Sequence, residues 1–106
     1  LDQRLDDVEN LAAAVVGGRI RERRKRLGLS QEDVAHLAEM HVTNLGKIER
    51  GQSNPSLTTI VRVAGVLDCD PGSLLTGLAL EDVPAATHKL TARDLIAARE
   101  AQQRGT

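Results

Sequence analysis

The sequence predicts an all-α protein, a compact domain of five short helices with a further helical segment on either side. Three observations support this prediction. Apolar residues recur at three- and four-residue spacing between residues 10 and 75, as on the buried face of a helix. Residues that begin and end helices divide this region at short intervals. Phe, Trp and Tyr are absent, so the core must consist of Leu, Val, Ile and Ala, which suits close-packed helices.

The chain of 106 residues is long enough for one domain and a tail. Residues 1–9 are expected to form a helical lead-in, residues 10–79 the helical domain, and residues 80–106 a linker with a C-terminal helix. Thr91 and Asp94 form a capping box that begins this last helix. Its apolar content is small, so it either docks on another surface or frays.

The first helix of the domain is expected over residues 10–26. Gly17 and Gly18 each cost about 1 kcal/mol against alanine inside a helix, which a close approach of another helix at this point would offset. Gly28 ends the helix as a C-terminal cap after a basic last turn, whose charge suits the helix dipole. The apolar stripe of this helix consists of Leu11, Val15 or Val16, Ile20 and Leu27.

Two helices follow with almost no chain between them. Ser30 is the N-cap of the first and forms a capping box with Asp33. Residues 39–41 make the turn, and the second helix spans residues 42–50 and ends at Gly51. The residues expected to face inward are Val34, Leu37 and Ala38 in the first helix, and Leu45 and Ile48 in the second.

A fourth and a fifth helix complete the domain. The fourth begins near Ser56 and ends at residues 68–70, and Pro71 suits the first position of a short fifth helix. The apolar residues of these two helices are Leu57, Ile60, Val61, Ala64 and Leu67 in the fourth, and Leu74 and Leu75 in the fifth.

Charge is distributed unevenly along the chain, whose net charge is −1. Residues 19–62 contain nine Lys and Arg against five Asp and Glu, a net +4, and the remainder contains five against ten. A basic centre between acidic ends favours a phosphate-bearing partner at the centre. The absence of aromatic residues argues against binding single strands by base stacking.

Several classes of protein are disfavoured by the residues present. Cys69 is the lone cysteine, so no disulfide within the chain and no thiolate metal site is expected, which fits a reducing cytoplasm. No stretch is apolar enough to span a membrane. His36, His41 and His88 lack metal-ligand spacing, and no Ser/His/Asp arrangement is evident. We therefore predict a cytoplasmic protein that is not an enzyme and has no catalytic residues, cofactor or metal.

Four short motifs occur in order along residues 16–75. They are "LSQ" at the start of the second helix, "IERG" at the end of the third, "NPSL" at the start of the fourth and "P-x-x-LL" in the fifth. They lie within "GRIRERRKRLGLSQEDVAHLA" and "NLGKIERGQSNPSLTTIVRVAGVLDCDPGSLL", which resemble the helix-turn-helix of the Cro/phage-repressor (XRE) family. The resemblance implies a five-helix, lambda-repressor-like fold that binds double-stranded DNA. "MHVTNLGKIERG" also resembles controller proteins of restriction–modification systems.

Two positions depart from the family pattern. The family usually has glycine where this chain has Glu39, because that residue often takes a left-handed conformation, so we expect a slightly different turn here. The family often has a polar or basic residue where this chain has Val42, which leaves the base read at that position open.

The third helix is expected to enter the major groove, which is about 12 Å wide and admits one helix. Its outer residues are predicted to read base edges, through the Thr43 hydroxyl, the Lys47 ammonium, the Val42 methyl groups and a close backbone approach at Gly46. The predicted base-reading residues are His41, Val42, Thr43, Gly46 and Lys47.

Contacts to the DNA backbone are expected on both sides of this helix. Gln31 opens the second helix, whose first amides point at a phosphate, and its side chain is also placed to support the third helix. Asn44 serves either the DNA backbone or helix packing. Arg19, Arg21 and Arg23 either add charge or form a solvated face. The predicted phosphate-binding residues are Gln31, Asn44, Arg50, Gln52, Asn54 and Ser56.

The resemblance also implies a structural ion pair between Arg24 of the first helix and Glu49 of the "IERG" segment. This pair is expected to be partly buried and to join the first helix to the third. Its role is structural, and removal of one partner would strand the other.

One such domain contacts only a half-site, so we expect a homodimer that spans about 34 Å of DNA. The expected seam is Leu74, Leu75 and Leu78, with the lead-in and the C-terminal helix as alternatives. The predicted function is that of a sequence-specific transcriptional regulator, a repressor. The alternative is an antitoxin-like protein or an adaptor whose main partner is another protein bound through the C-terminal tail.

Overall fold

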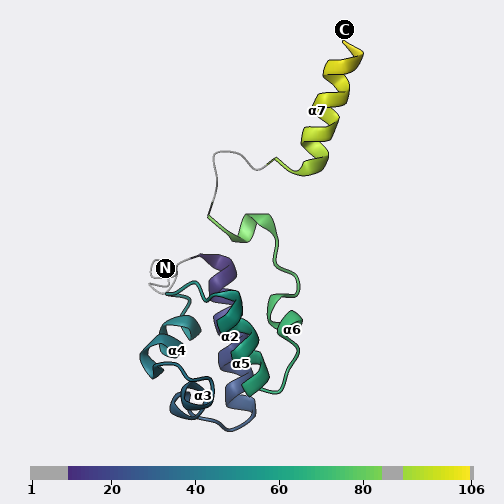
Figure 1. Cartoon of the computed structure of the whole chain (residues 1–106). Helices are drawn as coiled ribbons and strands as arrows, with labels where there is room; N and C mark the ends of the chain where they lie inside the picture. Colours follow the sequence, from purple (N-terminus) through teal and green to yellow (C-terminus); the bar gives the residue numbers. More distant parts are fainter. Residues whose placement is uncertain (1–9, 85–89, 106) are drawn as a thin grey trace.

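The computed structural model describes residues 10–84 and 90–105, and over these residues the protein is all-α with no strand. This confirms the predicted fold class (Figure 1). The lead-in predicted for residues 1–9 lies outside the described residues. The elements are α2 (Leu11–Arg26), α3 (Gln31–Leu37), α4 (Val42–Glu49), α5 (Leu57–Val66), α6 (Pro71–Leu75), the 3-10 helix η1 (Leu80–Asp82) and α7 (Ala92–Arg104).

The body of the protein is built around α2, which packs against α4 on one side and α6 on the other (Figure 1). The short α3 bridges α4 and α5, and α5 in turn packs on α6. All five helices contribute to one aliphatic core, in which each fully buried side chain stabilises the fold by about 1.5–3 kcal/mol. The largest fully buried side chains are Ile20, Val34, Leu45, Val63 and Leu67.

Side chains cap the helix starts as the sequence predicts. The Ser30 hydroxyl accepts a hydrogen bond from the Asp33 amide at 3.0 Å, and the Asp33 carboxylate accepts one from the Ser30 amide at 2.9 Å. This reciprocal pair is a capping box that satisfies two amides without an intrahelical partner. The caps of α2, α5 and α6 are simpler. In each, one side-chain oxygen accepts a hydrogen bond from a backbone amide of the first turn, and the capping residues are Asn10, Ser56 and Asp70.

The turn between α3 and α4 contains a non-glycine residue in the left-handed conformation. Glu39 has φ 55°, so the chain keeps the conformation that glycine usually supplies in the family, and the expected change of turn is not seen. Gly28 and Gly51 have φ 74° and 73°, which confirms both as helix-ending residues. Asp68, just beyond the end of α5, also has a positive φ, 54°. The sequence predicted that the helix ends here but not this left-handed conformation.

The crossing of α2 and α4 depends on a glycine. A Cβ added to Gly17 would overlap the carbonyl oxygen of Ile48, so no side chain fits there. The close helix approach expected at Gly17 is therefore confirmed. Gly18 has nothing within 4 Å of an added Cβ and contributes nothing to the crossing.

Three apolar side chains of the helical body are exposed, among them Leu37, which was expected to face inward. Leu37 is 60% exposed, Leu57 70% and Val61 48%. In α5 the buried stripe runs through Ile60, Val63 and Ala64, and Val61 is turned roughly 100° from Ile60 around the helix axis. The expectation for Leu37 was wrong, and all three side chains leave apolar surface uncovered.

The C-terminal helix lies apart from the body (Figure 1). Thr91 and Asp94 form the predicted capping box at its start. None of its residues is buried, and Leu95 and Ile96 are both exposed. Within residues 10–84 and 90–105, no helix has both the length and the apolar character needed to cross a membrane.

Candidate nucleic-acid interface

One face of α4 and the residue before it are exposed to solvent. His41 lies at the N-cap position, and Val42, Thr43 and Lys47 project from the helix on the side away from the core. The opposite face is fixed by Leu45 and Ile48, both of which are buried. Four of the five residues predicted to read bases therefore share a surface that no other part of the described chain covers.

Gly46, the fifth of these residues, lies on the same side of the helix but is buried beneath two side chains. An added Cβ would lie 3.0 Å from Arg50 Nη1 and 3.7 Å from Gln31 Oε1. The side chains of Arg50 and Gln31 thus cover this glycine.

The Arg24–Glu49 ion pair implied by the resemblance is present and buried. Arg24 Nε and Nη2 donate to the two Glu49 oxygens at 2.7 and 2.8 Å, a bidentate arrangement. Arg24 Nη1 also donates to the Leu29 carbonyl at 2.9 Å, and Gln31 Nε2 donates to Glu49 Oε1 at 3.0 Å. Arg24 is 8% exposed and Glu49 6%. These bonds join α2, the α2–α3 turn, α3 and α4 at one point.

The environment of this pair keeps both groups charged. Burial alone would raise the pKa of Glu49, but hydrogen bonds from Arg24 and Gln31, with the charges of Arg24 and Arg21, lower that pKa below its ordinary value. The hydrogen bond to Glu49 raises the pKa of Arg24, against the opposing effect of burial. The pair is therefore ionised at neutral pH.

The lowered pKa of Glu49 predicts a loss of stability in acid. Because the folded-state pKa lies below the unfolded value of about 4.3, the stabilisation is complete at pH values above about 5 and is lost as the pH falls through the folded-state pKa. Carboxyl carbon NMR of the folded protein should place the Glu49 midpoint below about 4.3. A midpoint at or above that value would show that burial outweighs the hydrogen bonds.

Polar side chains gather at the loop that follows α4. Arg50 Nε donates to Gln52 Oε1 at 2.9 Å, and Asn54 is exposed nearby in the chain. Ser56 caps α5 through its hydroxyl, which also donates to Thr59 Oγ1 at 3.0 Å. Asn44 is exposed on α4. Of the residues predicted to bind phosphate, Gln31, Arg50, Gln52 and Ser56 already have hydrogen-bond partners within the fold.

Two arginines of α2 have a structural role that sequence reasoning missed. Arg19 Nη1 donates to the Leu74 carbonyl at 3.1 Å, and Arg23 donates to the Leu67 and Asp68 carbonyls, both at 3.0 Å. These bonds fasten α2 to the end of α5 and to α6. They connect residues 44 to 55 positions apart, so local sequence patterns carry no signal for them.

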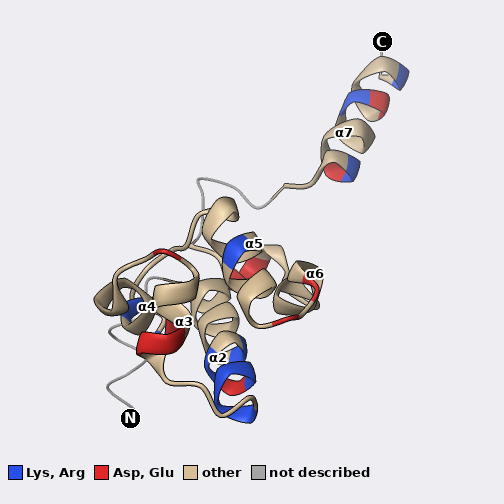
Figure 2. Ribbon diagram, turned by 60° about the horizontal axis from the view of Figure 1, so that its bottom comes forward, with Lys and Arg blue, Asp and Glu red and all other residues tan. Residues whose placement is uncertain are grey.

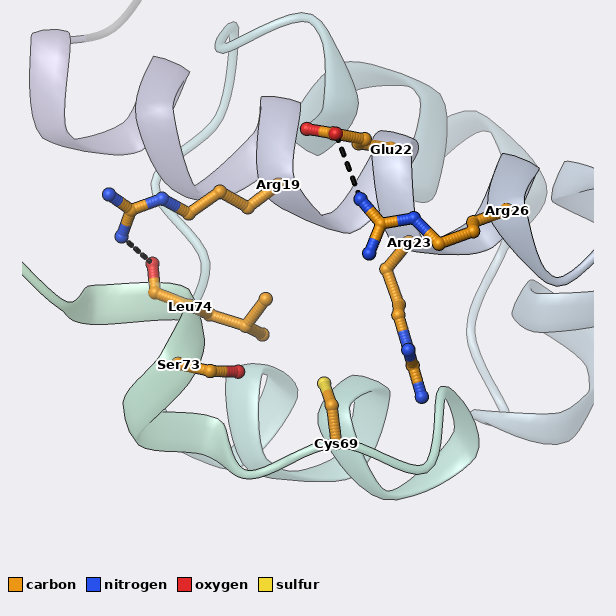
Figure 3. Close-up of a pocket in the computed structure, with 7 residues that line it drawn as sticks. All are labelled: Arg19, Glu22, Arg23, Arg26, Cys69, Ser73 and Leu74. Carbon is orange, nitrogen blue, oxygen red and sulfur yellow. Dashed lines mark hydrogen bonds and ion pairs between the residues drawn. The ribbon is translucent and has the colours of Figure 1, made fainter.

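These two side chains line a shallow surface cavity of about 310 Å³ between α2 and α6 (Figure 3). Arg26 Nη2 bonds Glu22 Oε1 across its rim at 2.9 Å. Arg19 and Arg23 therefore hold the fold together on the α6 side, so they are not a plain solvated face, and their added charge for DNA stays a prediction. The residues around the cavity are Arg19, Glu22, Arg23, Arg26, Cys69, Ser73 and Leu74.

Figure 2 shows how charge is arranged on the surface. Lys and Arg gather on the last turns of α2, whereas Asp and Glu mark α3 and the connection from α5 to α6. On α3 these are Glu32 and Asp33 of the first turn, where negative charge suits the helix dipole. On α4 and its C-cap the exposed charges are Lys47 and Arg50, both positive.

The predicted dimer seam requires a correction. Leu74 is 3% exposed and belongs to the core, and Leu78 packs against that core as well, so only Leu75 of the three presents much surface. A larger apolar surface lies on α5. We call it the α5 groove: it has a volume of about 460 Å³ and is lined by Leu57, Thr58, Val61 and Arg62.

The sequence matches known regulators over the helical body. The helix-turn-helix family HTH_3 matches residues 20–74. The HTH-type transcriptional regulator DdrOP3 of Deinococcus deserti is 38% identical over 60 residues, which is 57% of this chain but only 46% of that protein. The control protein C.SmaI of Serratia marcescens is 31% identical over 68 residues, which is 64% of this chain and 81% of that protein.

Among the solved structures that resemble this one are those of a controller protein and of a two-protein complex. The restriction–modification controller protein C.AhdI of Aeromonas hydrophila is 42% identical with a TM-score of 0.57, and the match covers 58% of this chain and 94% of that one. A chain from a complex of the SinR and SinI proteins is 28% identical with a TM-score of 0.56, and the match covers 85% of this chain and 81% of that one.

Proposed function

This chain belongs to the helix-turn-helix family of DNA-binding transcriptional regulators, of Cro/phage-repressor type, and from that premise we propose that it is a homodimeric repressor that reads the major groove with α4. The observation that carries the proposal is the uncovered face of α4, with Thr43 and Lys47 projecting from it. We propose action in the cytoplasm, through binding and without catalysis.

The dimensions of α4 suit this role. A helix with its side chains is about 10–12 Å across, similar to the roughly 12 Å width of the major groove, so α4 fits within it. In that groove the Thr43 hydroxyl bonds a base edge or its methyl group contacts a thymine methyl, and Val42 packs on a thymine methyl. Lys47 reaches the guanine acceptors O6 and N7. Asn44, Arg50, Gln52 and Asn54 then contact the flanking phosphates, with Gln31 and Ser56 in supporting positions.

Alanine substitutions on α4 test base reading. Thr43→Ala and Lys47→Ala should each weaken binding to the preferred duplex by about 1–3 kcal/mol and weaken binding to random duplex much less. Lys25→Ala removes one exposed positive charge from the last turn of α2, outside α4, and serves as the matched control. Fluorescence titrations with a duplex obtained by binding-site selection measure both affinities. Equal losses on selected and random DNA would argue against base reading.

We propose that the two protomers meet through the α5 groove rather than through Leu74. Leu57 and Val61 are exposed apolar side chains of the same helix, and covering them with a second copy removes that surface from water. The homodimer then presents two α4 helices to half-sites about 34 Å apart. The operator of such a dimer has two-fold symmetry.

A charge placed in the α5 groove should separate the protomers. Val61→Glu is expected to convert a dimer to a monomer in sedimentation equilibrium and to reduce binding to a two-half-site duplex at least tenfold, because a buried unpaired carboxylate is strongly unfavourable. Leu37→Glu changes a similarly exposed residue on α3 and should leave the dimer intact. Dimerisation that survives Val61→Glu, or fails in Leu37→Glu, would place the seam elsewhere.

A second candidate function is that of a protein-binding partner, antitoxin-like or adaptor, that acts through α7. Leu95 and Ile96 are exposed on a helix with no buried residue, and one of the similar chains was solved in a complex of the SinR and SinI proteins. A chain that ends at residue 84 should then keep its DNA affinity and lose a stoichiometric protein partner found with the full chain. A full chain that selects no duplex but retains such a partner would favour this function over the regulator.

A further inference from the structure

α4 has a glycine near its centre, where glycine is unfavourable. Gly46 is the fifth of the eight residues in Val42–Glu49, and glycine inside a helix is about 1 kcal/mol less favourable than alanine. Its φ is not positive, so the backbone does not require glycine. The residue is also buried, although it lies on no apolar contact surface. The space that a side chain at Gly46 would fill is therefore used in another way.

That space holds the guanidinium of Arg50. An added Cβ on Gly46 would lie 3.0 Å from Arg50 Nη1 and 3.7 Å from its Cζ, so the guanidinium rests directly over the glycine. Arg50 follows Gly46 by one helical turn, and helical side chains lean back toward the preceding turn. Nε of the same guanidinium donates to Gln52 Oε1 at 2.9 Å. The guanidinium is thus packed over Gly46 and hydrogen-bonded to Gln52.

A second polar side chain borders the same space. Gln31 Oε1 lies 3.7 Å from the added Cβ of Gly46, and Gln31 Nε2 is bound to Glu49 at 3.0 Å. The negative charge of Glu49 is already matched by Arg24, so Arg50 is not drawn to it. In the part of the chain that the structure describes, the Nη groups of Arg50 have no hydrogen-bond partner.

We infer that Gly46 is a positioning residue: the space left by its missing side chain holds the Arg50 guanidinium against α4, with its Nη groups free to bind a DNA phosphate. The inference rests on the proposed binding of DNA by α4. A planar guanidinium binds phosphate through two parallel N–H groups, and a side chain already held in place loses less entropy on binding. Gly46 thereby contributes to affinity without touching the DNA.

Gly46→Ala is the direct test. The new Cβ meets only the end of a flexible side chain, so the fold should persist, and the melting temperature should equal or exceed that of the wild type because alanine favours the helix. Affinity for the selected duplex should fall about threefold to tenfold, because the new methyl group displaces the Arg50 guanidinium from its position over α4. Gly18→Ala makes the same chemical change at an open position of α2 and should leave affinity unchanged.

A double-mutant cycle with Arg50→Ala tests whether Gly46 acts through the Arg50 side chain. Arg50→Ala should weaken binding and lower the slope of log affinity against log salt by about 0.9, as expected for one lost phosphate contact. Gly46→Ala added to Arg50→Ala should cause no further loss. The same fold loss in both backgrounds, or no loss in the wild-type background, would overturn the inference while leaving DNA binding intact. A wild-type chain that selects no duplex would overturn the proposed function and the inference together.

Discussion

Glu49→Ala is expected to destabilise the protein by about 3–5 kcal/mol, because it leaves the Arg24 guanidinium buried without its charged partner. The loss also releases Gln31, which donates to the same carboxylate. Since small domains are stable by only about 5–15 kcal/mol, a large part of the folding free energy depends on this one side chain. Urea unfolding at neutral pH, followed by circular dichroism, measures the change.

The exposed ion pair of α2 provides the control. Arg26 and Glu22 lie 2.9 Å apart with side chains 64% and 70% exposed, so Glu22→Ala should cost less than about 0.5 kcal/mol. Replacing both buried partners by apolar residues, as in Arg24→Met with Glu49→Leu, should recover much of the stability because no buried charge is stranded. A Glu49→Ala effect as small as that of Glu22→Ala would show that the buried pair is not a structural tie.

Gly17→Ala is the second large effect, expected to destabilise the protein by at least about 3 kcal/mol. The added methyl group would overlap a backbone carbonyl of α4, at Ile48, which cannot move away as a side chain can. The two helices would have to separate, and Val16 and Ile20 would lose packing against α4. The melting temperature and the urea midpoint should both fall sharply.

The neighbouring glycine provides a test within the same helix. Gly18→Ala meets nothing within 4 Å and should stabilise the protein by up to about 1 kcal/mol through helix propensity alone. Opposite signs for two adjacent Gly→Ala changes would be hard to explain by helix propensity. If both variants are stabilised, the close crossing of α2 and α4 is wrong.

The helices and their ends were predictable because their causes are local. Ser30 with Asp33 and Thr91 with Asp94 are separated by three residues, and each pair forms the hydrogen bonds that its spacing implies. Gly51 likewise acts on the turn next to it. The exposed face of α4 was predicted from the resemblance and from the helical spacing of Leu45 and Ile48, which face the core.

Features that depend on distant partners were not predictable. Val61 has the hydrophobicity of a core residue, but which side of α5 is buried is decided by where α3 and α6 pack. Arg19 and Arg23 look like free surface charges until α6 and the end of α5 place main-chain carbonyls beside them. The burial of Gly46 was not predictable either, because nothing in the sequence shows that the Arg50 side chain folds back over it.

The central claim is that α4 lies in the major groove, and methylation interference on a selected duplex tests it most directly. Methylation at guanine N7 blocks the major groove, whereas methylation at adenine N3 blocks the minor groove. We expect interference at guanine N7 in two blocks about 34 Å apart, each weakened by Lys47→Ala. Interference confined to adenine N3, or none within the selected site, would contradict the claim.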